Sequence, residues 1–262
     1  MSYRHRLTSE TDRSSVSVMR LSELETAQKE LGYSVDLLAS RAGLSRATGY
    51  RILSGQTDPR LDDLRELLLA AGLDLDLSVR PLSDPHAASA ARAMLGDLSV
   101  APGDEEIAAW TARLTRYSRG ETALLLGEAG RASAPQHRPG AVALAGSRWS
   151  IDRLASAGHA SEEPWALSGA AAFDAMGYDL QGVSVLWTTD PRRVSQLLAD
   201  TLTPTTTEHA DVLVVPAPAP LFQGAVDVEG VVLVSPLQAV LDGIGLGGDL
   251  AAIASELGRE WS

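Results

Sequence analysis

The chain has 262 residues, which at roughly 150 residues per domain predicts one large domain or two modest ones. Cysteine is absent, so disulfides, cysteine-ligated zinc, iron–sulfur clusters and thiol catalysis are excluded. No run approaches 18 consecutive apolar residues, and the polar N-terminus lacks the apolar core of a signal peptide. We therefore expect a cytoplasmic protein without a membrane partner.

The acidic excess is concentrated in one part of the chain. The net charge is −12, but residues 1–82 carry 11 basic and 12 acidic side chains, whereas residues 83–262 carry 11 and 22. An asymmetry of this kind indicates two parts with different roles. The nearly neutral N-terminal part is the one compatible with a nucleic-acid partner.

Residues 1–20 mix serine, threonine and charged residues without periodicity, which is typical of a flexible N-terminal tail. The favoured interpretation is a flexible segment that makes no specific contact. The alternative is an arm whose Arg4, Arg6 and Arg13 touch a phosphate backbone.

Residues 21–83 have the apolar spacing of four or five short helices. Ser34 and Ser45 precede two of these segments, where a hydroxyl can cap the first turn. Gly32 closes the segment before Ser34, and Gly43 closes the segment that Ser34 starts. The sequence therefore predicts a compact all-α domain.

Beyond Pro85 the pattern changes from helices alone to helices and strands. Helical stretches at 88–97 and 104–117 form an expected linker region over residues 84–120. The strand candidates are Ala141–Ala145, Val183–Thr189, Asp211–Pro216 and Val231–Ser235. The helix candidates between and after them are Glu162–Met176, Pro191–Thr201, Pro236–Leu241 and 249–258. Strands alternating with helices predict an α/β or α+β domain over 121–262.

No catalytic constellation is recognisable in this second part. The GxSxG, Walker A and HExxH patterns are missing, and the five histidines of the chain are scattered through loop-like sequence. We interpret Gly243–Asp249 as a helix end and turn rather than a phosphate loop, and Glu162–Glu163 and Asp104–Glu106 as helix starts. All five tryptophans are expected as core anchors: Trp110, Trp149, Trp165, Trp187 and Trp261. The sequence predicts no enzyme activity, no cofactor and no metal site.

The segment VDLLASRAGLSRATGYRILSGQTDP has the pattern of two short helices joined by a tight turn. Glycine stands at the turn, where a positive φ is needed, and the small Ala39 stands where the second helix must approach. With the leucine-rich helix that follows, the segment resembles the lambda-repressor/Cro (XRE) family over about Leu21–Leu77. The resemblance implies a helix–turn–helix DNA-binding domain at 21–83.

In that family the second of the two helices, here residues 45–54, lies in the major groove. By position, the resemblance implies base contacts from Ser45, Arg46, Ala47 and Arg51. It implies phosphate contacts from Ser34, Thr48, Ser54 and Gln56. For the two arginines the alternative is a solvated helix face. Tyr50 is either a phosphate contact or a core ring, and we favour the core.

Two positions depart from the family pattern. Val35 stands where glutamine is frequent, so one polar DNA contact is expected to be missing. Gly49 stands where a branched aliphatic residue is usual, and glycine inside a helix costs about 1 kcal/mol relative to alanine.

The C-terminal part contains three stretches that resemble AbiEi-family antitoxins. They are Trp165–Gly177, Leu186–Pro191 and His209–Gly248, the last including VSPLQAVLDGIGLGG. The resemblance covers about 160–258 and implies an antitoxin of a type IV toxin–antitoxin system that also represses its own operon. That family carries a winged helix–turn–helix, whereas the N-terminal part here is XRE-like.

The predicted fold is multidomain: an all-α helix–turn–helix DNA-binding domain followed by an α/β (or α+β) C-terminal domain. The predicted function is a sequence-specific transcriptional regulator, expected to be a repressor, that binds a palindromic double-stranded operator as a homodimer. Its acidic domain would serve dimerisation or effector or partner binding. The alternative is an antitoxin that neutralises a nucleotidyltransferase-like toxin and represses its own operon. An enzyme fused to a DNA-binding domain is the third and weakest hypothesis.

Overall fold

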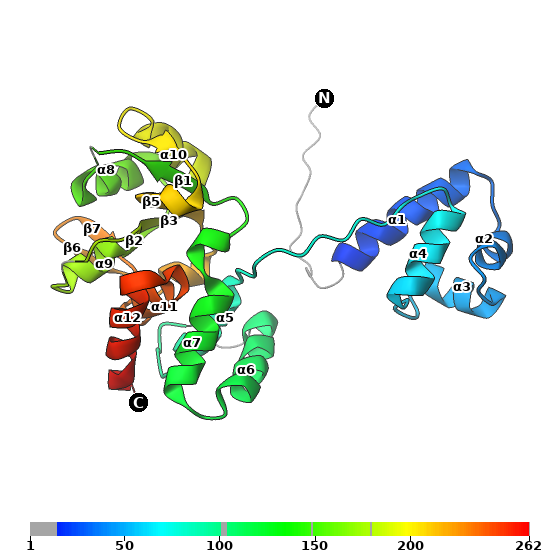
Figure 1. The fold of residues 1–262 in the computed structure, drawn as a ribbon, viewed down its shortest axis with the longest axis horizontal. Coiled ribbons are helices and arrows are strands. Elements are labelled where there is room, and N and C mark those ends of the chain that lie inside the picture. Colours follow the sequence, from blue (N-terminus) through cyan, green and yellow to red (C-terminus); the bar gives the residue numbers. More distant parts are fainter. Residues whose placement is uncertain (1–14, 101–103, 148, 179, 262) are drawn as a thin grey trace. The chain divides into compact units, whose positions relative to one another are not determined.

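The chain divides into two compact units, Met1–Val79 and Arg80–Ser262 (Figure 1). The computed structural model describes residues 15–100, 104–147, 149–178 and 180–261, with side chains from residue 23 onward. A helical N-terminal region is followed by a mixed α/β region, as predicted. The mixed sheet of the second region has seven strands. Among the described residues, no helix is long and apolar enough to cross a bilayer.

The described residues of the first unit form four helices. They are α1 (Ser15–Glu30), α2 (Val35–Arg41), α3 (Arg46–Leu53) and α4 (Leu61–Ala70). Their apolar faces meet in one core that contains Leu24, Leu38, Ile52, Leu67 and Leu68. The helix α1 begins at Ser15, so residues 15–20 are helical and not part of a tail as expected. Residues 1–14, with Arg4, Arg6 and Arg13, lie outside the described residues.

The helices α2 and α3 approach each other closely at Ala39 and Gly49. Both residues are buried, and a Cβ atom added to Gly49 would lie 2.6 Å from the Cβ atom of Ala39. A branched side chain at position 49 would therefore push α3 away from α2. Glycine at position 49 therefore has a packing reason in this chain.

We expect Gly49→Val to destabilise the first unit by about 1–3 kcal/mol, because overpacking forces neighbouring backbone to shift. Hydrogen exchange of α2 and α3 amides in the full chain measures this as lost protection. Ala39→Gly added to Gly49→Val should restore part of the protection by removing the opposing Cβ. The control is Ala47→Val on the exposed face of the same helix. Wild-type protection in Gly49→Val would contradict the close approach.

The helical part of the second unit is built from helices that are distant in sequence. They are α5 (Pro85–Met94), α6 (Glu105–Ser118), α7 (Thr122–Ser133), α11 (Pro236–Leu246) and α12 (Gly248–Leu257). The α6 side chains Ile107, Trp110 and Leu114 form one stripe and are buried in a core shared with α7 and α11. The helices α5 and α6 are thus an integral layer of the second unit, whereas a linker was expected over 84–120, because the stripe on α6 has to be covered.

The sheet of the second unit has the order β4-β1-β5-β3-β2-β7-β6. Its strands are β1 (Val142–Ala145), β2 (Trp165–Gly169), β3 (Ser184–Thr188), β4 (Thr203–Pro204), β5 (Val212–Pro216), β6 (Val226–Val228) and β7 (Val231–Leu233). The pairs β3/β5 and β2/β7 are parallel, and the others are antiparallel. The helices α8 (Ile151–Ser161) and α10 (Pro191–Leu198) pack on one face, and α11 packs on the other (Figure 1).

The four strand candidates are confirmed as β1, β3, β5 and β7, but the helix expected at Glu162–Met176 is wrong. That segment forms β2, an interior strand between β3 and β7, and then the short helix α9 (Ala170–Ala175). All five residues of β2 are buried, so the strand lacks the alternation that distinguishes a strand from a buried helix. Glu162 does not start a helix. It ends α8 with a left-handed φ of 60°.

Two further local predictions have mixed outcomes. Asp104 caps α6 as expected, since its carboxylate accepts from the N–H groups of Glu106 and Ile107. The helix end expected from Gly243 comes later, because α11 continues to Leu246 before Gly247 turns the chain. Within α11, Gly243 packs directly on the ring of Phe173, where a Cβ would lie 2.8 Å from the ring.

Candidate nucleic-acid interface

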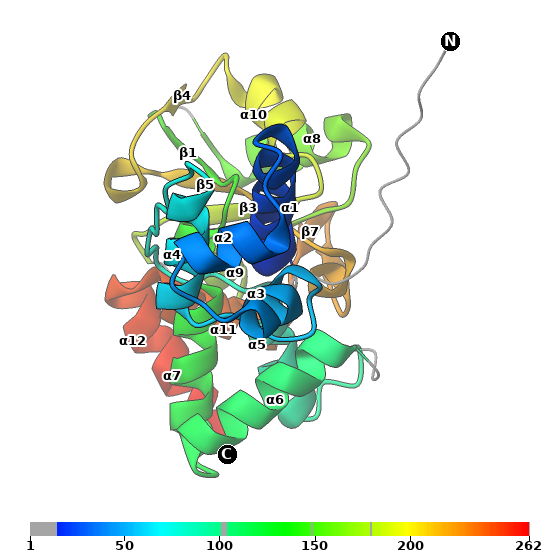
Figure 2. The same cartoon turned by 90° about the vertical axis from the view of Figure 1, so that its right-hand side faces the viewer.

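Local hydrogen bonds hold the N-terminal ends of α2 and α3, two helices that are labelled in Figure 2. The hydroxyl oxygen of Ser34 accepts from the N–H of Leu37, and that of Ser45 accepts from the N–H of Thr48. Both predicted N-caps are therefore confirmed. Gly43 adopts a φ of +70° in the turn, as predicted. Gly43 and the Ser45 cap lie in the turn itself and set the direction in which α3 leaves α2.

The exposed face of α3 carries two of the four residues predicted to contact bases, Ala47 and Arg51. Ala47, Tyr50, Arg51 and Ser54 are all exposed and recur at the spacing of one helix face. Tyr50 is 59% exposed, so the expectation of a core ring is wrong. Gly49 and Ile52 occupy the buried positions instead, and the tyrosine joins the candidate interface.

The two candidate arginines differ in their surroundings. The Nε atom of Arg46 lies 2.8 Å from the Asp36 carboxylate, and both side chains are largely exposed. The Nε atom of Arg51 donates to the carbonyl of Ala47 at 3.3 Å, which lays its guanidinium along the helix surface. Arg46 would have to exchange Asp36 for a base, whereas Arg51 carries no ion pair among the described residues.

The residues predicted to contact phosphates are near the surface, but three of them already make local hydrogen bonds. Ser34 caps α2, and the Thr48 and Ser45 hydroxyls lie 2.8 Å apart. The Ser54 hydroxyl donates to the carbonyl of Arg51. Gln56 is exposed just beyond α3.

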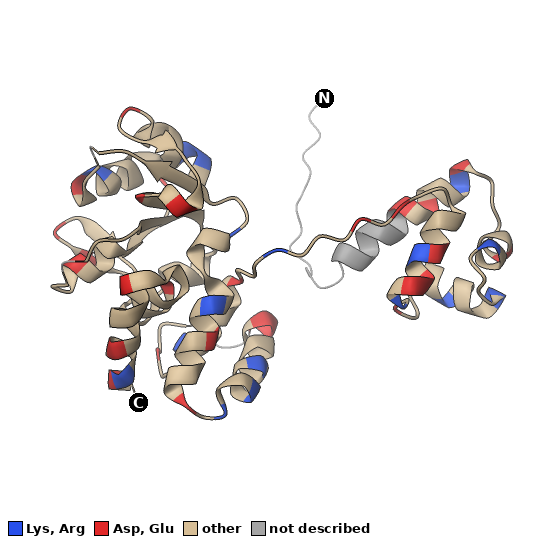
Figure 3. Ribbon diagram, viewed as in Figure 1, with Lys and Arg blue, Asp and Glu red and all other residues tan. Residues whose placement is uncertain are grey.

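Charge is unevenly distributed within the nearly neutral first unit (Figure 3). The helices α2 and α3 carry Arg41, Arg46 and Arg51 against one acidic residue, Asp36. By contrast, acidic side chains outnumber basic ones in the described part of α1 and in α4. The positive side of this unit is therefore the side that carries the helix pair, and a phosphate backbone is attracted there.

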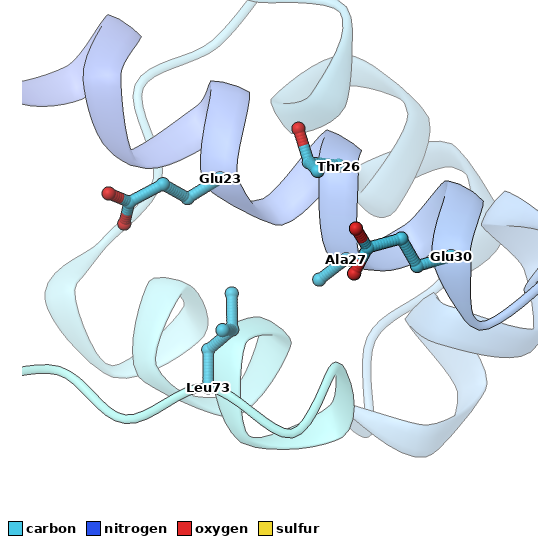
Figure 4. A pocket seen from close by; sticks show the side chains of 5 residues that line it. All are labelled: Glu23, Thr26, Ala27, Glu30 and Leu73. Carbon is cyan, nitrogen blue, oxygen red and sulfur yellow. The ribbon is translucent and has the colours of Figure 1, made fainter.

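A pocket of about 310 Å³ lies between α1 and the segment after α4. Its lining consists of Glu23, Thr26, Ala27, Glu30 and Leu73. Figure 4 shows Leu73 pointing toward α1, with the carboxylates of Glu23 and Glu30 on the pocket rim. This acidic rim makes the pocket unsuitable for phosphate, so it does not compete with α3 as a nucleic-acid interface.

The half-buried Asp84 of the second unit makes structural contacts. Asp84 caps α5, and its carboxylate accepts from the Trp110 indole N–H at 2.7 Å and pairs with His86. Burial pushes the pKa of Asp84 upward, but hydrogen bonds with His86 and Trp110 outweigh this and lower it to about 2. No cluster suited to a metal ion occurs in the part of the chain that the structure describes.

The three stretches that carry the second resemblance lie side by side in the fold. Trp165–Gly177 forms β2 and α9, Leu186–Pro191 contains the end of β3, and His209–Gly248 runs from β5 to α11. The strands β5, β3, β2 and β7 are neighbours at the centre of the sheet. Comparisons with protein-family models, curated proteins and solved structures find no match to this chain.

Proposed function

We propose that this protein is a sequence-specific regulator of transcription, acting as a repressor, that reads double-stranded DNA with α3. The observation that carries the proposal is the exposed face of α3, with Ala47, Tyr50 and Arg51 on the positive side of the first unit. An α-helix fits the major groove, where arginine can donate two hydrogen bonds to guanine and alanine can contact a thymine methyl. Arg51 is the principal base reader in this proposal.

Arg46 has a conditional role in the same interface. Its ion pair with Asp36 is exposed and therefore weak, of the order of 0–1 kcal/mol. A guanine or phosphate oxygen can replace the carboxylate at little cost. In the absence of DNA, the Asp36 carboxylate on α2 holds the Arg46 guanidinium beside the first turn of α3.

The surplus of positive charge on α2 and α3 is small, so one copy makes few phosphate contacts. We therefore propose that two copies bind a two-fold symmetric operator. The second unit, whose sequence is acidic, contributes dimerisation or binding of an effector or partner. It is not proposed to touch DNA.

Selection from a random-sequence duplex pool, with the DNA upstream of the gene included, tests the proposal. The wild-type full chain should enrich an inverted repeat. Arg51→Ala should weaken binding to that site by about 1–3 kcal/mol, or roughly 5- to 150-fold, with little change on random DNA. Arg46→Ala should have a smaller effect within this range.

The matched control is Arg65→Ala, which removes an exposed arginine from α4 on the acidic side of the unit. It should leave specific affinity unchanged. Failure of the wild type to enrich any sequence at low salt would refute the proposal. Equal losses from Arg65→Ala and Arg51→Ala would show a charge effect without base reading.

The alternative proposal is an antitoxin that binds a nucleotidyltransferase-like toxin through the second unit. It is supported by the adjacency of the AbiEi-like stretches at the centre of the sheet. The same variants separate the two activities, because Arg51→Ala would weaken operator binding and leave toxin neutralisation intact.

A further inference from the structure

A cavity of about 200 Å³ lies in the second unit where β2 ends and β3 begins. Its lining includes Trp149, Ile151, Ala170, Asp174, Leu180 and Ser184. These side chains come from the start of α8, from α9, from the loop before β3 and from β3 itself. The cavity is smaller than the roughly 300–1,000 Å³ sites of drug-sized ligands, so a matching ligand is a small molecule of fragment size.

A tight backbone turn builds one wall of this cavity. Gly169 turns the chain from β2 into α9 with a φ of +64°, and a Cβ there would lie 2.4 Å from the carbonyl oxygen of Val183. The N–H of Ala170 donates to the same carbonyl at 3.0 Å. These contacts set α9 directly beside the start of β3. The part of the lining that α9 and the start of β3 supply is therefore fixed by backbone contacts.

Ser184 is the unexplained polar group of this region. Ser184 is fully buried, and its hydroxyl has no hydrogen-bond partner among the described residues. Its backbone N–H, in contrast, donates to the carbonyl of Asp211. A buried hydroxyl without a partner destabilises a fold, so native structures rarely keep one without a reason. A ligand in the cavity would supply the missing partner.

The remaining lining defines the chemistry of that ligand. Asp174 is exposed and carries no ion pair in the part of the chain described, which leaves a carboxylate at the cavity. Trp149 and Ile151 add apolar surface, and an indole face also attracts cations. A carboxylate, a hydroxyl and an indole together favour a cationic nitrogen joined to an apolar body.

We propose that this cavity binds a small organic cation. The apolar body lies against Trp149 and Ile151, the ammonium or amidinium group pairs with Asp174, and one of its N–H groups donates to the Ser184 hydroxyl. Binding itself is independent of DNA. The ligand would also act as an effector of operator binding, and this part of the proposal rests on the function proposed above.

Benzamidine is a suitable probe because it joins a flat apolar ring to an amidinium group. Saturation-transfer NMR and calorimetry on the full chain without DNA should show saturable binding, and neutral benzyl alcohol and anionic benzoate should bind at least ten-fold more weakly. Asp174→Asn should weaken benzamidine binding about five- to ten-fold, consistent with loss of one charge-assisted hydrogen bond. The exposed Asp152→Asn on α8, outside the lining, should leave it unchanged.

Ser184→Ala separates a ligand-binding hydroxyl from a structural one. It should weaken benzamidine binding about three- to ten-fold. In the full chain without ligand, it should raise the melting temperature of the second unit by about 2–4 °C, because the hydroxyl without a partner is removed. A lowered melting temperature would show that the hydroxyl stabilises the free fold and would overturn the proposal. Absence of benzamidine binding, or equal binding of benzyl alcohol, would also overturn it. Neither result bears on DNA binding, since the assay contains no DNA.

Discussion

Replacing Arg92 with alanine is expected to destabilise the second unit by about 3–5 kcal/mol, because it removes a fully buried guanidinium that donates hydrogen bonds to four residues. From α5, the Arg92 guanidinium donates to the Asp97 carboxylate at 2.8 Å and to the Ser99 hydroxyl at 3.0 Å. It also donates to the carbonyl oxygens of Pro220 and Gln223. One side chain thus joins α5 to a segment more than a hundred residues away in sequence.

The charge of Asp97 depends on the same cluster. Burial pushes the pKa of Asp97 upward, but hydrogen bonds from Ser99 and Arg92 outweigh this and hold the pKa below its usual value. Without Arg92, one Asp97 oxygen and the carbonyl oxygens of Pro220 and Gln223 would lose the hydrogen bonds that the guanidinium supplies, whereas the other Asp97 oxygen would keep those from Ser99. Arg92→Met/Asp97→Asn should recover part of the lost stability, because both charges are then removed.

Tryptophan fluorescence is the direct measurement, because all five tryptophans belong to the second unit. Arg92→Ala should lower the melting temperature read by fluorescence by roughly 6–20 °C. The control is Arg131→Ala on α7, which removes an exposed pair with Glu128 and should cost less than about 1 kcal/mol. Equal effects of the two substitutions would show that the Arg92 cluster adds nothing to stability.

The free energy of unfolding of the second unit is expected to fall as the pH rises, because of the buried carboxyl group of Asp242. Asp242 is fully buried on α11, and its carboxylate accepts from the Ser168 hydroxyl at 2.6 Å and the Trp187 indole at 2.9 Å. The side-chain amide of Gln238 donates to its other oxygen at 2.8 Å. The cluster therefore fastens α11 to β2 and β3.

Burial raises the pKa of Asp242 from 3.8 to about 6, against the opposing effect of its three donors and of Arg138. The folded state therefore holds its proton more tightly than the unfolded state. This stabilisation is fully present below pH 3.8 and is lost as the pH rises through about 6. Relative to Asp242→Asn, the wild type should gain about 2–3 kcal/mol between about pH 7 and about pH 4.

Urea unfolding followed by tryptophan fluorescence at several pH values measures this difference. Asp84, whose pKa is lowered to about 2, destabilises the fold on acidification below its ordinary pKa of 3.8, outside this window. The control is Glu256→Gln, an exposed carboxylate on α12, which should keep the wild-type slope. An Asp242→Asn slope equal to that of the wild type would show that Asp242 titrates at an ordinary pKa in the fold.

The local features of the first unit could be predicted because they depend on neighbours in the sequence. Ser34 and Ser45 cap helices through the N–H of a residue three positions later, and Gly43 needs a positive φ at its own turn. The side of α3 that Tyr50 occupies could not be predicted. It depends on the contact between Gly49 and Ala39, which lets α3 approach α2 with the glycine inward and the tyrosine outward.

In the second unit, the amino-acid sequence by itself determined the charge asymmetry, the absence of cysteine chemistry, and the strands whose apolar runs lie between turn residues. Tertiary structure alone decided that Trp165–Gly169 is a strand, because a segment buried on both faces has no periodicity to reveal its conformation. It also decided which polar residues meet. Asp242 and Ser168, or Arg92 and Gln223, are brought together by packing between distant segments, and no local spacing encodes that contact.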